Sequence, residues 1–196
     1  MRNLLSLLIL ITAIAASAQI GGTSAFTFSL IENSAKHTAL GGVSITNTDA
    51  DPSSGFQNPA LINHEMHKSI SLSYANQVAD LNYGFLSYSH SWDTASSFLF
   101  SMGFYDYGKF TRTDAAGDII GEFTADDYNF QIGWSKKYND KITYGVNGKF
   151  LYSVYEAYVS TAGAIDLGGS YNDPDELLTA AVLIKNLGYQ FIRYGD

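Results

Sequence analysis

Tyr128-Asn129-Phe130-Gln131-Ile132-Gly133-Trp134 is the stretch that decides the fold class. Every second residue is large and apolar, and the residues between are small or uncharged polar ones. Successive side chains of a β-strand point to opposite faces, so this period of two predicts a strand with one apolar and one polar face. In a soluble sheet the polar face meets water, whereas in a transmembrane barrel the apolar face meets lipid and the polar face lines the lumen.

The second environment fits better, because the polar face carries no charge. We therefore predict that four side chains of this stretch face lipid, namely Tyr128, Phe130, Ile132 and Trp134. A soluble periplasmic sandwich or lipocalin-like binder is an alternative, but a surface that faces water is normally far more charged.

The same alternation recurs from residue 67 onward and predicts six further strands. Their apolar series are Ile70 to Tyr74, Leu86 to Trp92, Phe98 to Phe104, Ile142 to Val154, and two weaker ones, Val159 to Tyr171 and Leu178 to Ile184. Most of these series approach the roughly 9–11 residues of a tilted transmembrane strand. The predicted fold is an all-β, antiparallel outer-membrane β-barrel over residues 67–196.

Composition supports this class. The chain has no cysteine, which excludes a small domain held together by disulfides. Charged residues make up 15% of the chain, against about 25% in an average soluble domain. The net charge of −8 argues against a nucleic-acid partner, for which a basic surface is expected.

The start of the chain predicts a secretory signal over residues 1–18. Met1-Arg2 is followed by an apolar run from Leu4 to Ala15 and by the cleavage pattern Ala16-Ser17-Ala18. No later stretch approaches the roughly 18 apolar residues of a membrane helix, so a membrane would be crossed by strands.

Residues 19–66 differ from the repeating part and predict a compact plug segment with short helices. Ser34 is expected to cap a helix that starts at Ala35 and ends at Leu40, before Gly41 and Gly42. Asn58 and Pro59 predict a second capped turn. Residues 43–46 look like a strand, and residues 49–55 look like a loop.

The connections between the predicted strands suggest a topology. Tight polar turns are expected after the second, fourth and sixth strands, whereas a long acidic loop is expected from Asp106 to Asp127. Outer-membrane barrels have short periplasmic turns and longer external loops. We therefore expect the N-terminus in the periplasm and the long loop outside the cell.

Several patterns imitate chemical sites without meeting their requirements. The residues from His64 to His67 lack the histidine spacing of a zincin helix. Asp49, Asp51 and Ser53 begin like a calcium loop, but Ala60 stands where a bidentate Glu is needed. His37 is expected to be packed or hydrogen-bonded rather than catalytic. With no nucleophile motif either, we expect a protein that is not an enzyme and has no catalytic residues, cofactor or metal.

Five motifs resemble one group of outer-membrane proteins. They are Gln19-Ile20-Gly21-Gly22, the stretch from Ser34 to Gly42, Asp49-Ala50-Asp51, Asn58-Pro59-Ala60-Leu61, and Lys185-Asn186-Leu187-Gly188-Tyr189-Gln190. Together they resemble the PorV/PorQ group of the type IX secretion system of Bacteroidetes, PorQ most closely, within the wider set of FadL-like barrels. Much of that wider set shares the second and fourth motifs.

The resemblance implies a role in secretion or in surface attachment of cargo proteins, with membrane lipid, PorV, PorU and PorZ-like proteins as partners. It also implies that Ser34, Ala35, Leu40, Gly41, Gly42, Asn58 and Pro59 form the structural motif of the plug. Members of the group have larger barrels, so these strands are expected to be the N-terminal half of one. The alternative is a FadL-like transporter of hydrophobic small molecules, whose route would be lined by Phe26, Phe28, Leu30, Leu40 and Ile45.

Overall fold

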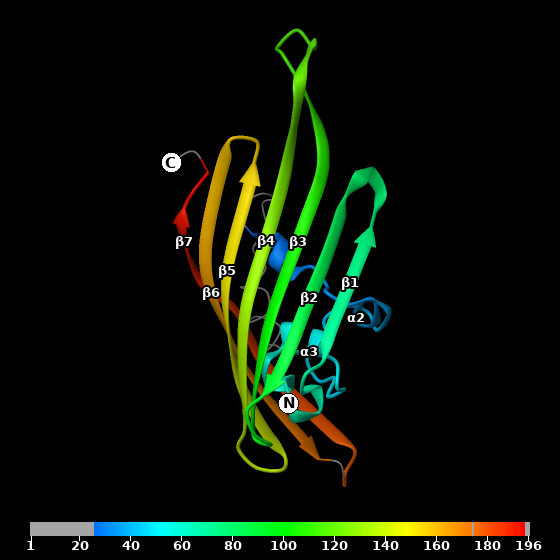
Figure 1. The fold of residues 1–196 in the computed structure, drawn as a ribbon, viewed down its shortest axis with the longest axis vertical. Coiled ribbons are helices and arrows are strands. Elements are labelled where there is room, and N and C mark those ends of the chain that lie inside the picture. Colours follow the sequence, from blue (N-terminus) through cyan, green and yellow to red (C-terminus); the bar gives the residue numbers. More distant parts are fainter. Residues whose placement is uncertain (1–25, 174, 195–196) are drawn as a thin grey trace, which may run out of the picture.

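The computed structural model describes residues 26–173 and 175–194, and the predicted signal lies outside them. These residues form one seven-stranded antiparallel sheet in which each strand pairs with the next along the chain (Figure 1). The strands are β1 (Ile70–Asn76), β2 (Asn82–Ser91), β3 (Ser96–Thr113), β4 (Ile119–Lys137), β5 (Ile142–Tyr155), β6 (Tyr158–Asp173) and β7 (Leu178–Ile192). The prediction of seven antiparallel strands is therefore confirmed.

Short helices precede the sheet. They are the 3-10 helix η1 (Thr27–Leu30), α2 (Ala35–Ala39), α3 (Pro52–Gln57), η2 (Pro59–Leu61) and η3 (His64–Met66), and a further turn, η4 (Val78–Asp80), joins β1 to β2. We call residues 26–69 the N-terminal segment. Among the described residues, no helix has the length and apolar character needed to span a membrane.

The N-terminal segment matches part of its prediction. Ser34 caps α2 by accepting a hydrogen bond from the Lys36 amide at 3.2 Å, and Asn58 caps η2 by accepting one from Ala60 at 3.0 Å. Residues 43–46 form no strand, so that prediction is wrong. The predicted loop at 49–55 is partly helix α3, because Asp51 caps it and Pro52 suits its first turn.

The predicted long loop from Asp106 to Asp127 is also wrong. Most of it is a projecting hairpin made by the far ends of β3 and β4 (Figure 1). The rings of Phe110 and Phe123 stack across it with centroids 5.2 Å apart. Its turn closes where Asp114 accepts hydrogen bonds from the amides of Ala116 and Asp118, both at 2.9 Å. The lengths of the loops therefore do not distinguish the two ends of the sheet. The two ends differ instead because the β3–β4 hairpin projects beyond the other strands at one of them.

The N-terminal segment covers one face of the curved sheet, which we call the inner face; the opposite one is the outer face. Aromatic rings from both layers form the main core between them, with Phe28 and Phe56 of the segment against Phe85 and Tyr105 of the strands. A smaller core joins Ile62 and Met66 to Leu99.

The sheet is open in the described part of the chain. Its order runs from β1 to β7, and no pairing joins these two strands, which therefore present the two edges. Each edge offers a row of backbone N–H and C=O groups to a further strand.

Candidate functional site: an apolar outer face and a polar inner face

The polarity of the sheet is inverted relative to a soluble protein. On β4, Phe130 and Ile132 are 42% and 60% exposed, whereas Asn129 and Gln131 are 0% and 3% exposed. Tyr128 and Trp134 are half-buried on the same face as Phe130. The four side chains of the deciding stretch thus lie together on the outer face, and the uncharged polar ones lie beneath the N-terminal segment.

The apolar character extends across all seven strands. Two rows of paired residues on the outer face illustrate it: Leu72, Leu86, Met102, Phe130 and Phe150, and then Ile70, Tyr88, Phe100, Ile132, Gly148, Ile165 and Leu187. A surface this broad and apolar is much larger than monomeric soluble proteins expose.

Polar side chains bracket this apolar band. Asp106 pairs with Asp126 at one border, and Ser96 pairs with Lys136 at the other. Ten residues separate Asp126 from Lys136 on β4. At about 3.3 Å per residue they span about 33 Å of strand, and a tilt of about 40° reduces the height to about 25 Å. That is the height of the apolar band of outer-membrane barrels.

Aromatic side chains lie just inside both borders. Next to the acidic pair, one row crosses the sheet with Tyr74, Phe104, Tyr128 and Tyr152. Near Lys136, the ring of Trp134 meets that of Tyr144 edge-on, with centroids 5.9 Å apart. Aromatic girdles of this kind flank the apolar band of membrane barrels.

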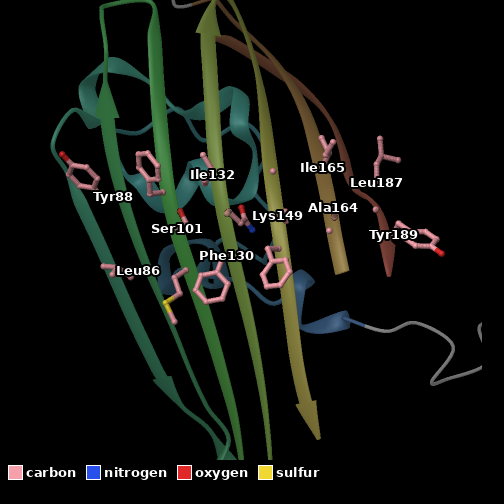
Figure 2. Close-up of a pocket in the computed structure, with 17 residues that line it drawn as sticks. Leu86, Tyr88, Ser101, Phe130, Ile132, Lys149, Ala164, Ile165, Leu187 and Tyr189 are labelled. Carbon is pink, nitrogen blue, oxygen red and sulfur yellow. The ribbon is translucent and has the colours of Figure 1, made fainter. Parts of the chain in front are cut away.

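The band contains a wide, shallow hollow of about 1070 Å³ over β2 to β7. Figure 2 shows Leu86, Phe130, Ile132 and Ile165 around it. Gly148 lies at its floor, where the outer face has no side chain to offer.

The inner face receives the N-terminal segment at three glycines, Gly133, Gly145 and Gly168, which we call the glycine seat. A Cβ atom on Gly145 would lie 2.5 Å from the backbone oxygen of Pro59, and one on Gly168 would collide with Asn58. Beside them, Ser135 donates a hydrogen bond of 2.6 Å to the carbonyl of Ile62. The predicted motif residues Asn58 and Pro59 therefore rest directly on strand backbone.

A buried ion pair lies next to this seat. Lys149 Nζ is 2.6 Å from Asp166 Oδ2, and neither side chain is exposed. The Lys149 ammonium also donates to the side-chain oxygen of Asn186 at 2.9 Å, and the backbone N–H of Asn186 donates to Asp166 Oδ1 at 2.8 Å. Buried charges of this kind are stable only when they are paired and hydrogen-bonded.

A β-bulge in β7 extends these contacts to the N-terminal segment. Lys185 and Asn186 together oppose Asp166, and Asn186 has a φ of 57°. Both side chains then reach the segment: Lys185 donates to Gln57 at 3.1 Å and Asn186 donates to Ser29 at 3.3 Å. Gln57 in turn donates to Glu32 at 2.7 Å, and burial raises the pKa of Glu32 while Lys185 opposes that shift.

The remaining predicted motif residues lie in and after α2, away from the glycine seat. Ala35 and Leu40 are exposed, and Gly41 and Gly42 end the helix with φ of 96° and 103°. His37 is fully buried on α2, with its ring nitrogens 3.4 Å from Asn33 Oδ1 and 3.4 Å from Ser54 Oγ. Burial lowers the pKa of His37.

The side chains suggested for a transport route are divided between the core and the surface, although the rings of Phe26 and Phe28 contact each other. Phe28 is buried in the main core, whereas Leu30 and Leu40 are 57% and 65% exposed. The residues from His64 to His67 have a structural role at the sheet edge: His67 Nδ1 accepts a hydrogen bond from the Ser91 amide at 3.1 Å. No group of three potential metal ligands occurs within residues 26–173 and 175–194.

The sequence analysis missed Lys149 as a partner for Asp166. The pairing of Asn147 with Asp166, which brings Lys149 close, depends on strand register and not on a local sequence pattern. No family model matches the chain, and no curated protein sequence matches it significantly.

Proposed function

We propose that this chain forms part of the wall of an outer-membrane β-barrel, with the N-terminal segment as a plug inside the lumen. One observation carries the proposal: an apolar band about 25 Å high covers the outer face, with polar borders and aromatic girdles. Within the height of that band, charged and amide side chains of the strands such as Asn129, Lys149 and Asp166 are buried on the inner face.

The open edges agree with a wall rather than with an isolated sheet. In a bilayer each unpaired backbone N–H or C=O costs several kcal/mol, so β1 and β7 must pair with further strands there. The proposed barrel is therefore larger than these seven strands.

Within that barrel, we assign a role in type IX secretion or in surface attachment of cargo, alongside PorV, PorU and PorZ-like proteins. The support is the set of motifs named above, of which Asn58-Pro59-Ala60-Leu61 sits on the glycine seat. The contacts of the N-terminal segment with Lys185, Asn186 and Ser135 favour a firmly held plug over an open transport route.

Cysteine labelling of intact cells tests the membrane proposal, and the lack of native cysteine keeps the experiment clean. Single cysteines at Ala116 and Asn139 lie in the turns at opposite ends of β4. We expect a membrane-impermeant maleimide to label Ala116→Cys only, and both variants once the outer membrane is permeabilised. Equal labelling of both in intact cells would contradict a spanning strand.

The assigned role is tested separately by purifying the tagged protein from native outer membrane and identifying its companions by mass spectrometry. Secretion predicts PorV, PorU or PorZ-like proteins among them. Recovery without any of these, from membranes that contain them, would overturn the secretion role and leave the barrel assignment standing.

A further inference from the structure

One glycine at the floor of the hollow in the outer face is left uncovered. Gly148 occupies an outer-face position on β5, between Val146 and Phe150. A Cβ atom built on it would meet nothing nearer than the backbone oxygen of Ile132, at 4.0 Å. Neither the packing nor a left-handed backbone requires glycine at this position.

Other strand glycines contrast with it. A Cβ atom on Gly133 or Gly145 would meet the N-terminal segment at 2.5–2.8 Å. On the outer face, the Phe104 ring covers Gly84 and the Phe191 ring covers Gly163. A glycine within a strand weakens the strand, and it often marks a place where a ligand or another backbone approaches closely.

The position of the hollow identifies the chemistry of its occupant. Gly148 pairs with Ile132, which lies six residues from Asp126 and four from Lys136, near the middle of the apolar band. The outer-face side chains around it are aliphatic or aromatic. At that depth the neighbouring material in a bilayer is hydrocarbon, without hydrogen-bonding groups.

We propose that this hollow is a binding site for one acyl chain of a membrane phospholipid, which lies over Gly148 between Phe130, Phe150 and Ile165. The inference rests on the proposed membrane location and adds a defined site to it.

Tryptophan quenching tests the site. The chain has two tryptophans, and Trp92→Phe leaves Trp134, which lies two residues from Ile132 of the hollow, as the reporter. Phosphatidylethanolamine with brominated acyl chains is titrated into the protein in detergent micelles. We expect quenching that saturates at about one lipid per protein.

The variant Gly148→Phe places a ring over the floor of the hollow, and Ala180→Phe adds the same ring at an exposed outer-face position of β7, outside the hollow. We expect Gly148→Phe to weaken lipid binding at least about tenfold and Ala180→Phe to leave it unchanged. Gly148→Val replaces Gly148→Phe if heat-modifiable gel mobility shows that the larger residue prevents folding.

The outcomes separate this inference from the membrane proposal. Failure of the protein to insert into phospholipid vesicles would overturn both. Insertion with quenching that never saturates, or with equal affinity in the filled and control variants, would overturn the acyl-chain site alone. A dimer whose population falls on Gly148→Phe would also overturn it, because a second copy would then be the occupant.

Discussion

The two faces of this sheet are built from the same strands, yet they follow opposite rules. On the outer face large apolar side chains such as Ile132 are exposed, whereas on the inner face Asn147 and Asp166 are completely buried. Alternation along each strand puts these two sets one residue apart. One pattern of period two therefore encodes two environments, an apolar one outside and a polar, buried one inside. Each environment can be tested by introducing a side chain that suits only the opposite face.

The inner face should give the largest effect, through its buried ion pair. Lys149→Met leaves the Asp166 carboxylate unpaired, and loss of one partner of a buried pair costs about 3–5 kcal/mol. The free energy of unfolding from detergent by urea is the measurement. The double variant Lys149→Met/Asp166→Leu should recover most of the loss, since no charge then stays buried. A single variant as stable as the wild type would show that water reaches this pair.

The outer face gives the next effect. Ile132→Arg places a charge near the centre of the apolar band and should cost about 2–4 kcal/mol in a bilayer. Thr124→Arg, at an exposed position of β4 beyond Asp126, is the matched control and should cost less than about 1 kcal/mol. Folding into vesicles, followed by heat-modifiable gel mobility, measures both. Equal costs would break the comparison, because they would place both positions in water.

Two glycines on neighbouring strands sharpen the comparison further. Gly145→Ala forces a methyl group against Pro59 on the inner face and should cost about 1–3 kcal/mol. Gly169→Ala on the outer face meets a single atom, Val182 Cγ1 at 3.3 Å, and should be nearly neutral. Urea unfolding of both variants checks this difference. A neutral Gly145→Ala would mean that the N-terminal segment is held loosely on the sheet.

The smallest expected effect concerns His37 and pH. Because burial lowers the pKa of His37, the unfolded chain takes up the proton first as the pH falls below about 6.5. The free energy of unfolding therefore decreases toward acid pH through this residue. His37→Gln keeps hydrogen-bonding groups facing Asn33 and Ser54, so its melting temperature should fall less between pH 8 and pH 5 than that of the wild type. Equal falls would exclude this histidine as a source of the acid sensitivity.

The strands were predictable because the alternation of apolar and polar residues is a local pattern of neighbouring positions. The same holds for the caps at Ser34 and Asn58, since each acts within two residues. Helix α3 was missed because Gln57 is the one good helix former in Pro-Ser-Ser-Gly-Phe-Gln, although Asp51 followed by Pro52 was a usable signal. The projecting hairpin was predicted as a loop because its sequence is rich in glycine and acidic residues, although Phe110 and Phe123 are typical strand residues.

The inner-face contacts were beyond sequence reasoning for a different reason. The neighbours of Lys149 and the fit of Pro59 over Gly145 depend on the register of three strands and on how the segment docks. Neither quantity is encoded in a local pattern. In the sequence, the hollow at Gly148 corresponds only to a glycine that interrupts the apolar series from Ile142 to Val154.

The sequence distances of the inner-face contacts determine the order of assembly. The hydrogen bond between Ser135 and Ile62 spans 73 residues, and the one between Asn186 and Ser29 spans 157. The N-terminal segment is therefore synthesised first, but its binding surface is complete only when β7 has joined the sheet. Contacts of such separation form slowly, since a long loop must close before they are made. Until then the buried faces of α3 and η2 are exposed, so this chain depends most on chaperones before the segment that left the ribosome earliest docks on the sheet.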